Sequence, residues 1–339
     1  MSSSGPGDDR PVLRDDTLPV LLAVGPEHEQ AAPAYPGWAT IASQRQLRGI
    51  ATGKDGSVWL ATRGGLLRWY RGMERFTRYS SEHGLPGNAV AAVAVDDAGQ
   101  AWATSEGGSL FRLDGEEWRP CPALQDTRVA ALTVDQAGRL WAATSAGLWA
   151  IDGPSDVSQV GGNFGGLVPR GLAVTDGGDA WVWTAVALHH LGSTGWEPPR
   201  PARGVLALAC QGESLWLGTA AGVQRFDHAG TPASSNWPRG EVVALAAGAD
   251  GVWAAVRGKA GYEVGFATAA SWIRVAGRPF RERVVGLAAA GQDEVWIATD
   301  DGLALGSTAG TRWYQTEGPP EVIPVEGSRT ESLSNLVQA

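Results

Sequence analysis

The sequence predicts an all-β protein, a β-propeller whose blades are four-stranded antiparallel sheets. Three observations carry this prediction: the amino-acid composition, a tryptophan motif that recurs along the chain, and the turn signals within each repeat. The 339 residues include 47 glycines and 16 tryptophans but only 2 methionines. Many glycines and tryptophans with few methionines favour short strands and tight turns over packed helices.

A tryptophan recurs seven times in segments of similar sequence, of which SLWLGTAAGVQRFD at 214–227 is a clear example. Neighbouring copies of this tryptophan are 35 to 43 positions apart. A repeat of about 40 residues suits a propeller blade, whereas leucine-rich repeats are shorter and helical repeats need long 3.6-residue patterns. The motif tryptophans are Trp59, Trp102, Trp141, Trp181, Trp216, Trp253 and Trp296.

Each repeat divides into four short strands. An alternating apolar segment such as Val90–Val95 ends at an acidic or glycine turn (DDAG at 96–99), and the tryptophan strand follows. A glycine-containing loop leads to a third strand and to a fourth segment with a further aromatic residue, such as Trp118. Asp-Gly at 55–56 and at 250–251 favours hairpin turns, because both central positions need positive φ. This order of strands is typical of one propeller blade.

Because the motif residues recur from repeat to repeat, we interpret them as residues that pack the blades together. A tryptophan at one position of every blade is expected to pack between neighbouring sheets and to bury roughly 150–250 Å². The Thr or Ser that follows it, as at Thr62 and Thr144, is expected to bind nearby backbone groups. The acidic residues Asp55, Asp96 and Asp135 recur at the first turn of their repeats, so turn chemistry explains them.

Seven blades are favoured, and eight remain an alternative. Trp38 lies where the fourth strand of a preceding blade would be, and an N-terminal strand that joins the last blade would close the ring. Trp313 occupies a similar place in the last repeat. Either the Trp38 strand completes the seventh blade and the Trp313 segment has another role, or both ends form an imperfect eighth blade. We expect residues 1–16 to be disordered, residues 17–317 to form the propeller, and residues 318–339 to be a tail that completes a blade or docks.

Charge and composition disfavour several classes of partner. The formal net charge is −9 and no run of Lys and Arg is present, so a nucleic-acid partner is not expected. The acidic N-terminal stretch lacks the basic patch of a secretory signal, and the first apolar run, Val20–Val24, is too short to span a bilayer. Cys121 and Cys210 are interpreted as incidental thiols. We therefore expect a cytoplasmic protein without membrane insertion.

The sequence contains no motif for catalysis or for a cofactor: GxSxG, a P-loop, and GxGxxG before a helix are all absent. Glu-His-Glu at 27–29 has no second cluster of ligands, so no metal site is expected. His189 and His190 are neighbours on a predicted strand and point to opposite faces, so we expect one packed ring and one exposed ring. We expect a protein that is not an enzyme and that has no cofactor.

Loops that differ between the repeats are the candidates for a binding site. The loop after the tryptophan strand and the loop that enters each new blade are expected on the same face, around the central channel. A mouth that carries both charge signs suits a polar partner, because fixed charges select its orientation; a solvated rim is the alternative. The insertion VRGKAGYEVG at 256–265 is the first candidate for a specific contact. The candidate binding residues are Arg63, His83, Asn88, Glu106, Arg257, Lys259, Asp300 and Asp301.

One stretch resembles a known family of repeats. HGLPGNAVAAVAVDDAGQAW at 83–102, followed by LFRLD, resembles the propeller repeats of two-component regulator sensor proteins. This resemblance implies a propeller that presents a platform for a ligand or a partner. The Asp-Gly turn before a tryptophan is also similar to streptogramin B lyase, which implies an enzyme, but the Trp-Phe-Thr of those repeats is absent here.

Three functions follow from these observations. The leading hypothesis is a non-catalytic interaction module that binds a protein partner through the channel-mouth loops, within a larger bacterial assembly. The first alternative is a sensor propeller that binds a small ligand. The second alternative is a propeller enzyme similar to streptogramin B lyase.

Overall fold

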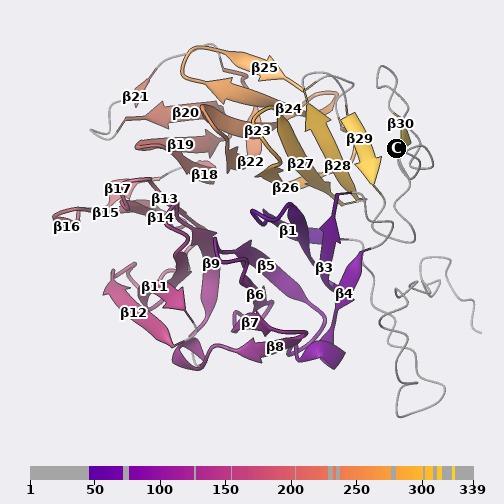
Figure 1. The fold of residues 1–339 in the computed structure, drawn as a ribbon. Helices are drawn as coiled ribbons and strands as arrows, with labels where there is room; N and C mark the ends of the chain where they lie inside the picture. The colour runs from indigo at the N-terminus through magenta and orange to yellow at the C-terminus, as the bar shows by residue number, and fades with distance from the viewer. Residues whose placement is uncertain are drawn as a thin grey trace, which may run out of the picture.

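The protein is a seven-bladed β-propeller, which confirms the predicted fold and blade number. Seven antiparallel sheets are arranged in a ring, and the described residues contain almost no helix (Figure 1). The computed structural model describes residues 46–71, 76–125, 127–153, 155–202, 204–227, 232–233, 237–275, 280–300, 302–307, 311–314 and 323–324. No helix among these residues has the length and apolar character needed to cross a membrane.

The first four blades follow one another along the chain. Blade 1 contains β1 (Leu47–Thr52), β2 (Ser57–Thr62), β3 (Gly65–Tyr70) and β4 (Thr77–Tyr79). Blade 2 contains β5 (Val90–Val95), β6 (Ala101–Ser105), β7 (Leu110–Asp114) and β8 (Glu117–Pro120). Blade 3 contains β9 (Val129–Val134), β10 (Leu140–Thr144), β11 (Gly147–Gly153) and β12 (Asp156–Gly161). Blade 4 contains β13 (Gly171–Val174), β14 (Ala180–Trp183), β15 (Ala187–Gly192), β16 (Gly195–Trp196) and β17 (Arg200–Pro201).

The last three blades continue this order, and two short 3-10 turns lie before blades 2 and 3. Blade 5 contains β18 (Val205–Gln211), β19 (Ser214–Thr219), β20 (Gly222–Phe226) and β21 (Pro232–Ala233). Blade 6 contains β22 (Glu241–Ala247), β23 (Gly251–Gly258), β24 (Gly261–Thr268) and β25 (Trp272–Arg274). Blade 7 contains β26 (Val284–Ala289), β27 (Glu294–Thr299), β28 (Leu303–Ser307), β29 (Thr311–Tyr314) and β30 (Ile323–Pro324). The 3-10 turns are η3 (Ser81–His83) and η4 (Pro122–Leu124).

The ring closes by packing of the last blade against the first. The first strand of each blade is innermost and packs beside the first strands of both neighbouring blades, and β26 lies beside β1 in the same way (Figure 1). The seventh blade takes its fourth strand, β29, from the segment that contains Trp313. The closure in which an N-terminal strand takes that place is therefore wrong, because β28 already pairs with β29. β30 adds a fifth strand outside β29.

The ends of the chain lie mostly outside the described residues. These outer parts include Trp38, the Glu-His-Glu triplet at 27–29, and all of the tail except β30. The boundaries expected at residues 16 and 317 therefore stay predictions.

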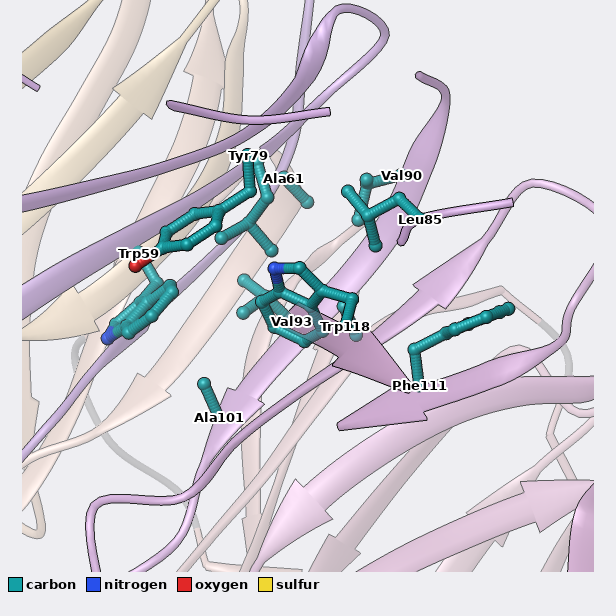
Figure 2. Close-up of a cluster of buried hydrophobic side chains, with 11 residues drawn as sticks. Trp59, Ala61, Tyr79, Leu85, Val90, Val93, Ala101, Phe111 and Trp118 are labelled. Carbon is teal, nitrogen blue, oxygen red and sulfur yellow. The ribbon is translucent and has the colours of Figure 1, made fainter. Parts of the chain in front are cut away.

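The hydrophobic core is divided into seven clusters, one between each pair of neighbouring blades. Each motif tryptophan lies on the second strand of its blade, is at most 5 % exposed, and packs against the following blade. Trp59 of blade 1, for example, packs with Val93 and Trp118 of blade 2 (Figure 2). Trp296 of blade 7 packs with Leu47 of blade 1, which joins the ring. The predicted packing role of the tryptophans is confirmed.

The innermost strands carry small residues where they converge. Gly or Ala occupies the same register position in every blade, two pairs from the motif tryptophan. At this position, a Cβ added to Gly286 would lie only 3.1 Å from Cγ2 of Ile50 in the next blade. Larger side chains here would force neighbouring blades apart. The seven positions are Gly49, Ala92, Ala131, Gly171, Ala207, Ala244 and Gly286.

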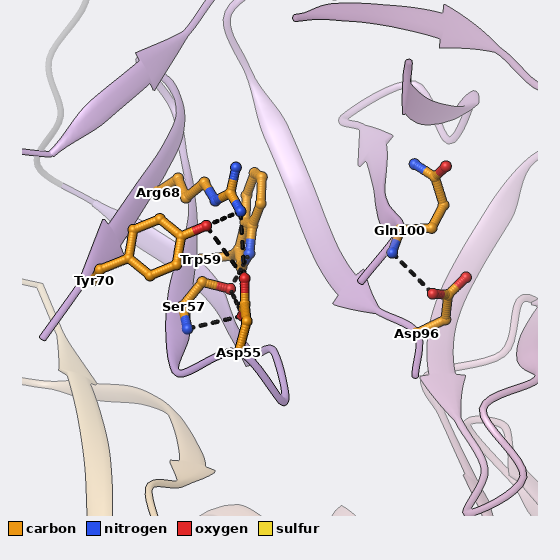
Figure 3. Close-up of polar contacts among 7 residues, drawn as sticks. All are labelled: Asp55, Ser57, Trp59, Arg68, Tyr70, Asp96 and Gln100. Atoms are coloured by element: carbon orange, nitrogen blue, oxygen red, sulfur yellow. Dashed lines mark hydrogen bonds and ion pairs between the residues drawn. The ribbon is translucent and has the colours of Figure 1, made fainter. Parts of the chain in front are cut away.

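The acidic turn and the tryptophan after it are joined by hydrogen bonds. Asp96 accepts the Gln100 backbone N–H on Oδ1 (2.9 Å) and the Trp102 indole N–H on Oδ2 (3.2 Å). Figure 3 shows the Asp96–Gln100 bond. Asp135 makes the same pair of bonds, including one of 2.8 Å from the Trp141 indole. Both pairs have the acid six residues before the tryptophan, so the carboxylate fixes the turn and the ring together.

The threonine that follows the tryptophan strand closes the next turn. The hydroxyl groups of Thr62, Thr144, Thr219 and Thr299 each donate to a glycine carbonyl three residues later, at 2.8–3.0 Å. The predicted backbone role is thus confirmed. Blade 6 has Val256 at this position, and its hairpin continues for two further residue pairs to Gly258 and Gly261.

Removal of one of these carboxylates is expected to destabilise the fold. Asp135→Ala should lower the free energy of unfolding by about 1–3 kcal/mol, because it leaves the buried Trp141 indole N–H without its acceptor. The measurement is urea denaturation followed by tryptophan fluorescence. Asp250→Ala is the matched control, since Asp250 lies in the corresponding turn of blade 6 and makes no side-chain hydrogen bond with another described residue. Equal stability of the two variants would contradict the account.

Candidate functional site

The propeller has two faces that differ in their loops. The turns between the second and third strands (the 2–3 turns) and the loops that enter each blade form one face, here called the 2–3 face. Backbone bonds tie these segments together: Glu106 N–H donates to Ala89 O (3.0 Å), and Asp300 N–H donates to Arg283 O (3.0 Å). The turns between the first and second strands (the 1–2 turns) lie on the opposite face, the 1–2 face.

His83 and Asn88 hold the loop that enters blade 2. The Ser80 N–H donates to His83 Nδ1 (3.2 Å), and the Ser81 N–H donates to Asn88 Oδ1 (3.2 Å). Gly84 has φ +86°, and a Cβ there would lie 2.3 Å from the Trp118 carbonyl oxygen. The Gly-Leu-Pro-Gly-Asn motif is therefore part of a loop that packs on Trp118 through Leu85. The His83 ring also packs on Tyr79 of β4, with 5.6 Å between the ring centroids.

The charged candidate residues are spread around the 2–3 face and are partly paired. Glu106 lies 3.1 Å from Arg48 of blade 1, Arg257 lies 3.5 Å from Glu241, and Asp300 lies 3.7 Å from Arg283. Arg63 and Lys259 are exposed and make no ion pair with another described residue. Asp301 lies outside the described residues. The structure brings these candidates to one face but not to one point.

The insertion in blade 6 lengthens the β23–β24 hairpin, with Lys259 at its tip. The hairpin is fixed to the loop that enters blade 7, because Tyr262 and Phe280 exchange backbone hydrogen bonds of 2.7 and 2.8 Å. Arg257 and Lys259 are thus carried by a hairpin that backbone hydrogen bonds hold in place.

Sequence reasoning missed an apolar surface on this face. Among the described residues, four of the five exposed large apolar side chains lie in the loop entering blade 4, the 2–3 turn of blade 4, and the start of β18. The fifth, Ile273, lies on the outer strand β25. We call the four the blade-4 patch: Leu167 (36 % exposed), Val168 (51 %), Val186 (58 %) and Leu206 (38 %). The signals in the sequence were the stretch GGNFGGLVPR at 161–170 and Ala187, which stands where the corresponding turns of blades 1, 3, 5 and 7 have Gly.

Charge is segregated between the two faces. On the 1–2 face, carboxylates outnumber cations in the 1–2 turns. On the 2–3 face, cations outnumber carboxylates among the described residues of the turns and entering loops. The 1–2 turns contain Asp55, Asp96, Asp97, Asp135, Asp176, Asp179, Glu213, Asp250 and Asp293 against Lys54 and Arg139. The 2–3 face contains Arg63, Arg128, Arg170, Arg239, Lys259, Arg281 and Arg283 against Glu82, Glu106, Glu282 and Asp300.

Asp55 forms the densest polar cluster on the 1–2 face (Figure 3). Ser57 donates to Asp55 Oδ1 through its hydroxyl (2.6 Å), and the Tyr70 hydroxyl donates to Oδ2 (3.2 Å). Burial pushes the pKa of the Asp55 carboxyl up, but the bonds from Ser57 and Tyr70 and the charge of Arg68 outweigh it, so that this pKa lies below its ordinary value. Ser57 also accepts the Trp59 indole N–H (2.9 Å), so the cluster supports the blade.

His189 and His190 are both buried, and the expectation of one exposed ring is wrong. The His190 ring stacks on Trp181 at 3.8 Å, with its nitrogens 3.2 Å from Asp179 and 3.1 Å from Glu197. The hydrogen bond with His190 lowers the pKa of Glu197. Burial lowers the pKa of His189, whose ring packs on Phe164. Because the His190 side chain is only 7 % exposed, the cluster has little access to a substrate.

The two cysteines are buried thiols. Burial raises the pKa of Cys121 and of Cys210, which keeps both protonated at neutral pH, whereas the thiolate is the form that attacks or binds metals. Across the described ranges, no group of three or more His, Cys, Asp or Glu residues is arranged to hold a metal ion.

Comparisons with known proteins identify the fold and no family. No family model matches the sequence, and no curated protein matches it either. Virginiamycin B lyase from Staphylococcus aureus is similar in structure, with a TM-score of 0.62 and 15 % identity over 78 % of this chain and 95 % of that one. PorZ, a surface component of the type-IX secretion system of Porphyromonas gingivalis, has a TM-score of 0.63 and 16 % identity over 85 % of this chain and 39 % of that one.

A chain of the mitotic checkpoint complex is also similar, with a TM-score of 0.60 and 14 % identity over 91 % of this chain and 97 % of that one. These structures include an enzyme and components of assemblies. At such identities the likeness shows a β-propeller and does not select among functions.

The Asp55 cluster gives a testable dependence of stability on pH. Because the folded-state pKa lies below the unfolded value of about 3.9, the contribution of Asp55 is present above about pH 4 and is lost as the pH falls through the folded-state pKa. In the Asp55→Asn variant, the free energy of unfolding should therefore depend less steeply on pH in this acidic range. The measurement is urea denaturation at several pH values. The same slope in the variant and the wild-type protein would rule out this role.

Proposed function

We propose that this protein is a non-catalytic interaction module that binds a protein partner with the 2–3 face. The observation that carries the proposal is the blade-4 patch, since it holds four of the five large apolar side chains that are exposed in the described part of the chain. Contiguous exposed apolar surface marks contact sites for other molecules, whereas single exposed residues need no explanation. The patch joins the loop that enters blade 4, the 2–3 turn of blade 4 and the start of β18 in blade 5.

The rigidity of the face supports this function. The entering loops and 2–3 turns are joined by backbone hydrogen bonds, and the blade-6 hairpin is fixed through Tyr262 and Phe280. Loops that are already ordered lose little conformational entropy on binding, so more of the contact energy becomes affinity. The similar chains in a secretion-system component and in the mitotic checkpoint complex are propellers that occur in assemblies.

The placement of the reactive side chains also supports a non-catalytic role. His83 binds its own loop, His189 and His190 are buried, and both thiols are held protonated by burial. General acid–base catalysis needs a group within hydrogen-bond reach of substrate, and His189, His190 and both thiols are buried. The cytoplasmic location expected from the sequence stays a prediction.

Affinity capture from native cell lysate, with quantitative mass spectrometry, tests the proposed function. The bait is the full chain, compared with Arg257→Glu/Lys259→Glu, with Val186→Asp, and with Asp250→Lys on the opposite face as control. We expect a stoichiometric partner that is kept by the control and lost or strongly reduced with at least one 2–3 face variant. Melting temperatures should be unchanged, because all four residues are exposed. A partner lost only with Asp250→Lys, or no partner, would refute the proposed use of this face.

A further inference from the structure

The segments that carry the blade-4 patch are joined by backbone hydrogen bonds. Val186 O accepts the Ala202 N–H (3.1 Å), which places the 2–3 turn of blade 4 beside the segment that leads to Leu206. The Arg170 N–H donates to Trp183 O (2.8 Å) and fixes the end of the loop that carries Leu167 and Val168. The exposed apolar side chains of two neighbouring blades are therefore supported by ordered backbone.

Three exposed arginines lie on the same face, in the loops that enter blades 3, 4 and 6. Arg170 follows Val168 by two residues, Arg128 enters the preceding blade 3, and Arg239 enters the following blade 6; all three are exposed. None of these arginines makes an ion pair with another described residue. Glu241, at the start of β22 on this face, already pairs with Arg257.

The local positive charge runs against the charge of the whole chain. The formal net charge is −9, and the opposite face carries the carboxylates of the 1–2 turns. An acidic partner would thus be repelled by one face and attracted to the other, which steers its approach and sets its orientation. Unpaired arginines also suit carboxylates because the guanidinium can donate two parallel hydrogen bonds.

We propose that the blade-4 patch and Arg128, Arg170 and Arg239 form a docking site for an acidic peptide segment with large apolar side chains. The proposal rests on the proposed function and names the chemistry of the partner. Apolar side chains of the segment cover the patch, and its carboxylates meet these arginines. The site offers aliphatic side chains and dispersed arginines, and no large aromatic residue is exposed among the described residues. Because Trp and Phe are common membrane anchors, this composition favours a peptide over a membrane surface.

Selection from a random peptide display library tests the proposal with the full-length protein as the target. We expect the enriched peptides to combine Asp or Glu with Leu, Ile, Val or Phe. Their affinity, measured by fluorescence anisotropy, should fall as ionic strength rises. Enrichment of basic peptides, or no enrichment, would overturn the proposal.

Matched variants locate the site. Arg170→Glu and Val186→Asp should each weaken binding of a selected peptide by about ten-fold or more, equivalent to about 1.4 kcal/mol. Arg274→Glu and Ile273→Asp are the controls, since they change an exposed cation and an exposed apolar residue of the outer strand β25, away from the patch. Equal loss in the controls would overturn the proposal.

Two further measurements separate other occupants. Co-sedimentation with phosphatidylserine vesicles that is lost with Val186→Asp would show a membrane site, and self-association lost with Val186→Asp would show a second copy; either result would overturn the peptide proposal. A different outcome is a partner from lysate that is lost with Val186→Asp but binds Arg170→Glu as well as the wild-type protein. This result would refute the proposed acidic segment and leave the proposed function intact. Loss of capture only with Asp250→Lys would refute the proposed function itself.

Discussion

The packing of one tryptophan from each blade against the next blade is the interaction on which the rest of the structure depends. No four-stranded sheet of this size covers its own apolar surface, so each blade needs a neighbour on both sides. The seven motif tryptophans fill the seven interfaces, including the one between blade 7 and blade 1. Small residues at the convergence of the inner strands allow this close approach. Ring closure is therefore a condition for burial of the core.

This constraint leaves the loops free to differ, within limits set by the turns. On the 1–2 face, Asp96 and Asp135 serve the turn and the tryptophan at once, so much of the acidic character there has a structural origin. On the 2–3 face, threonine closes several turns with a single hydroxyl, and the loops beyond it vary. The loop that enters blade 4 and the longer hairpin of blade 6 bring exposed apolar and cationic side chains to the same face. Function is expected where the repeat is broken.

Features that recur from repeat to repeat could be predicted from the sequence. Features that depend on contacts between distant segments could not. The blade number, the buried tryptophans and the threonine bonds follow from seven copies of one pattern. The role of Trp313 did not, because Trp38 and Trp313 carry similar local signals and only strand pairing separates them. His83 and Asn88 accept backbone hydrogen bonds within their own loop, and these bonds depend on how the loop folds. The burial of both His189 and His190 depends on the strands beside them. The blade-4 patch was missed because exposure of Val186 and Leu206 is a property of the folded surface.

Hydrogen–deuterium exchange of the full chain, with and without its captured partner or a selected peptide, tests the central claim most directly. Slower exchange is predicted for backbone amides in residues 162–170, 184–186 and 202–206, since these segments carry the patch. The 1–2 turns should be unchanged. Protection confined to the 1–2 turns or to the outer strands would contradict the assignment of the 2–3 face as the binding surface.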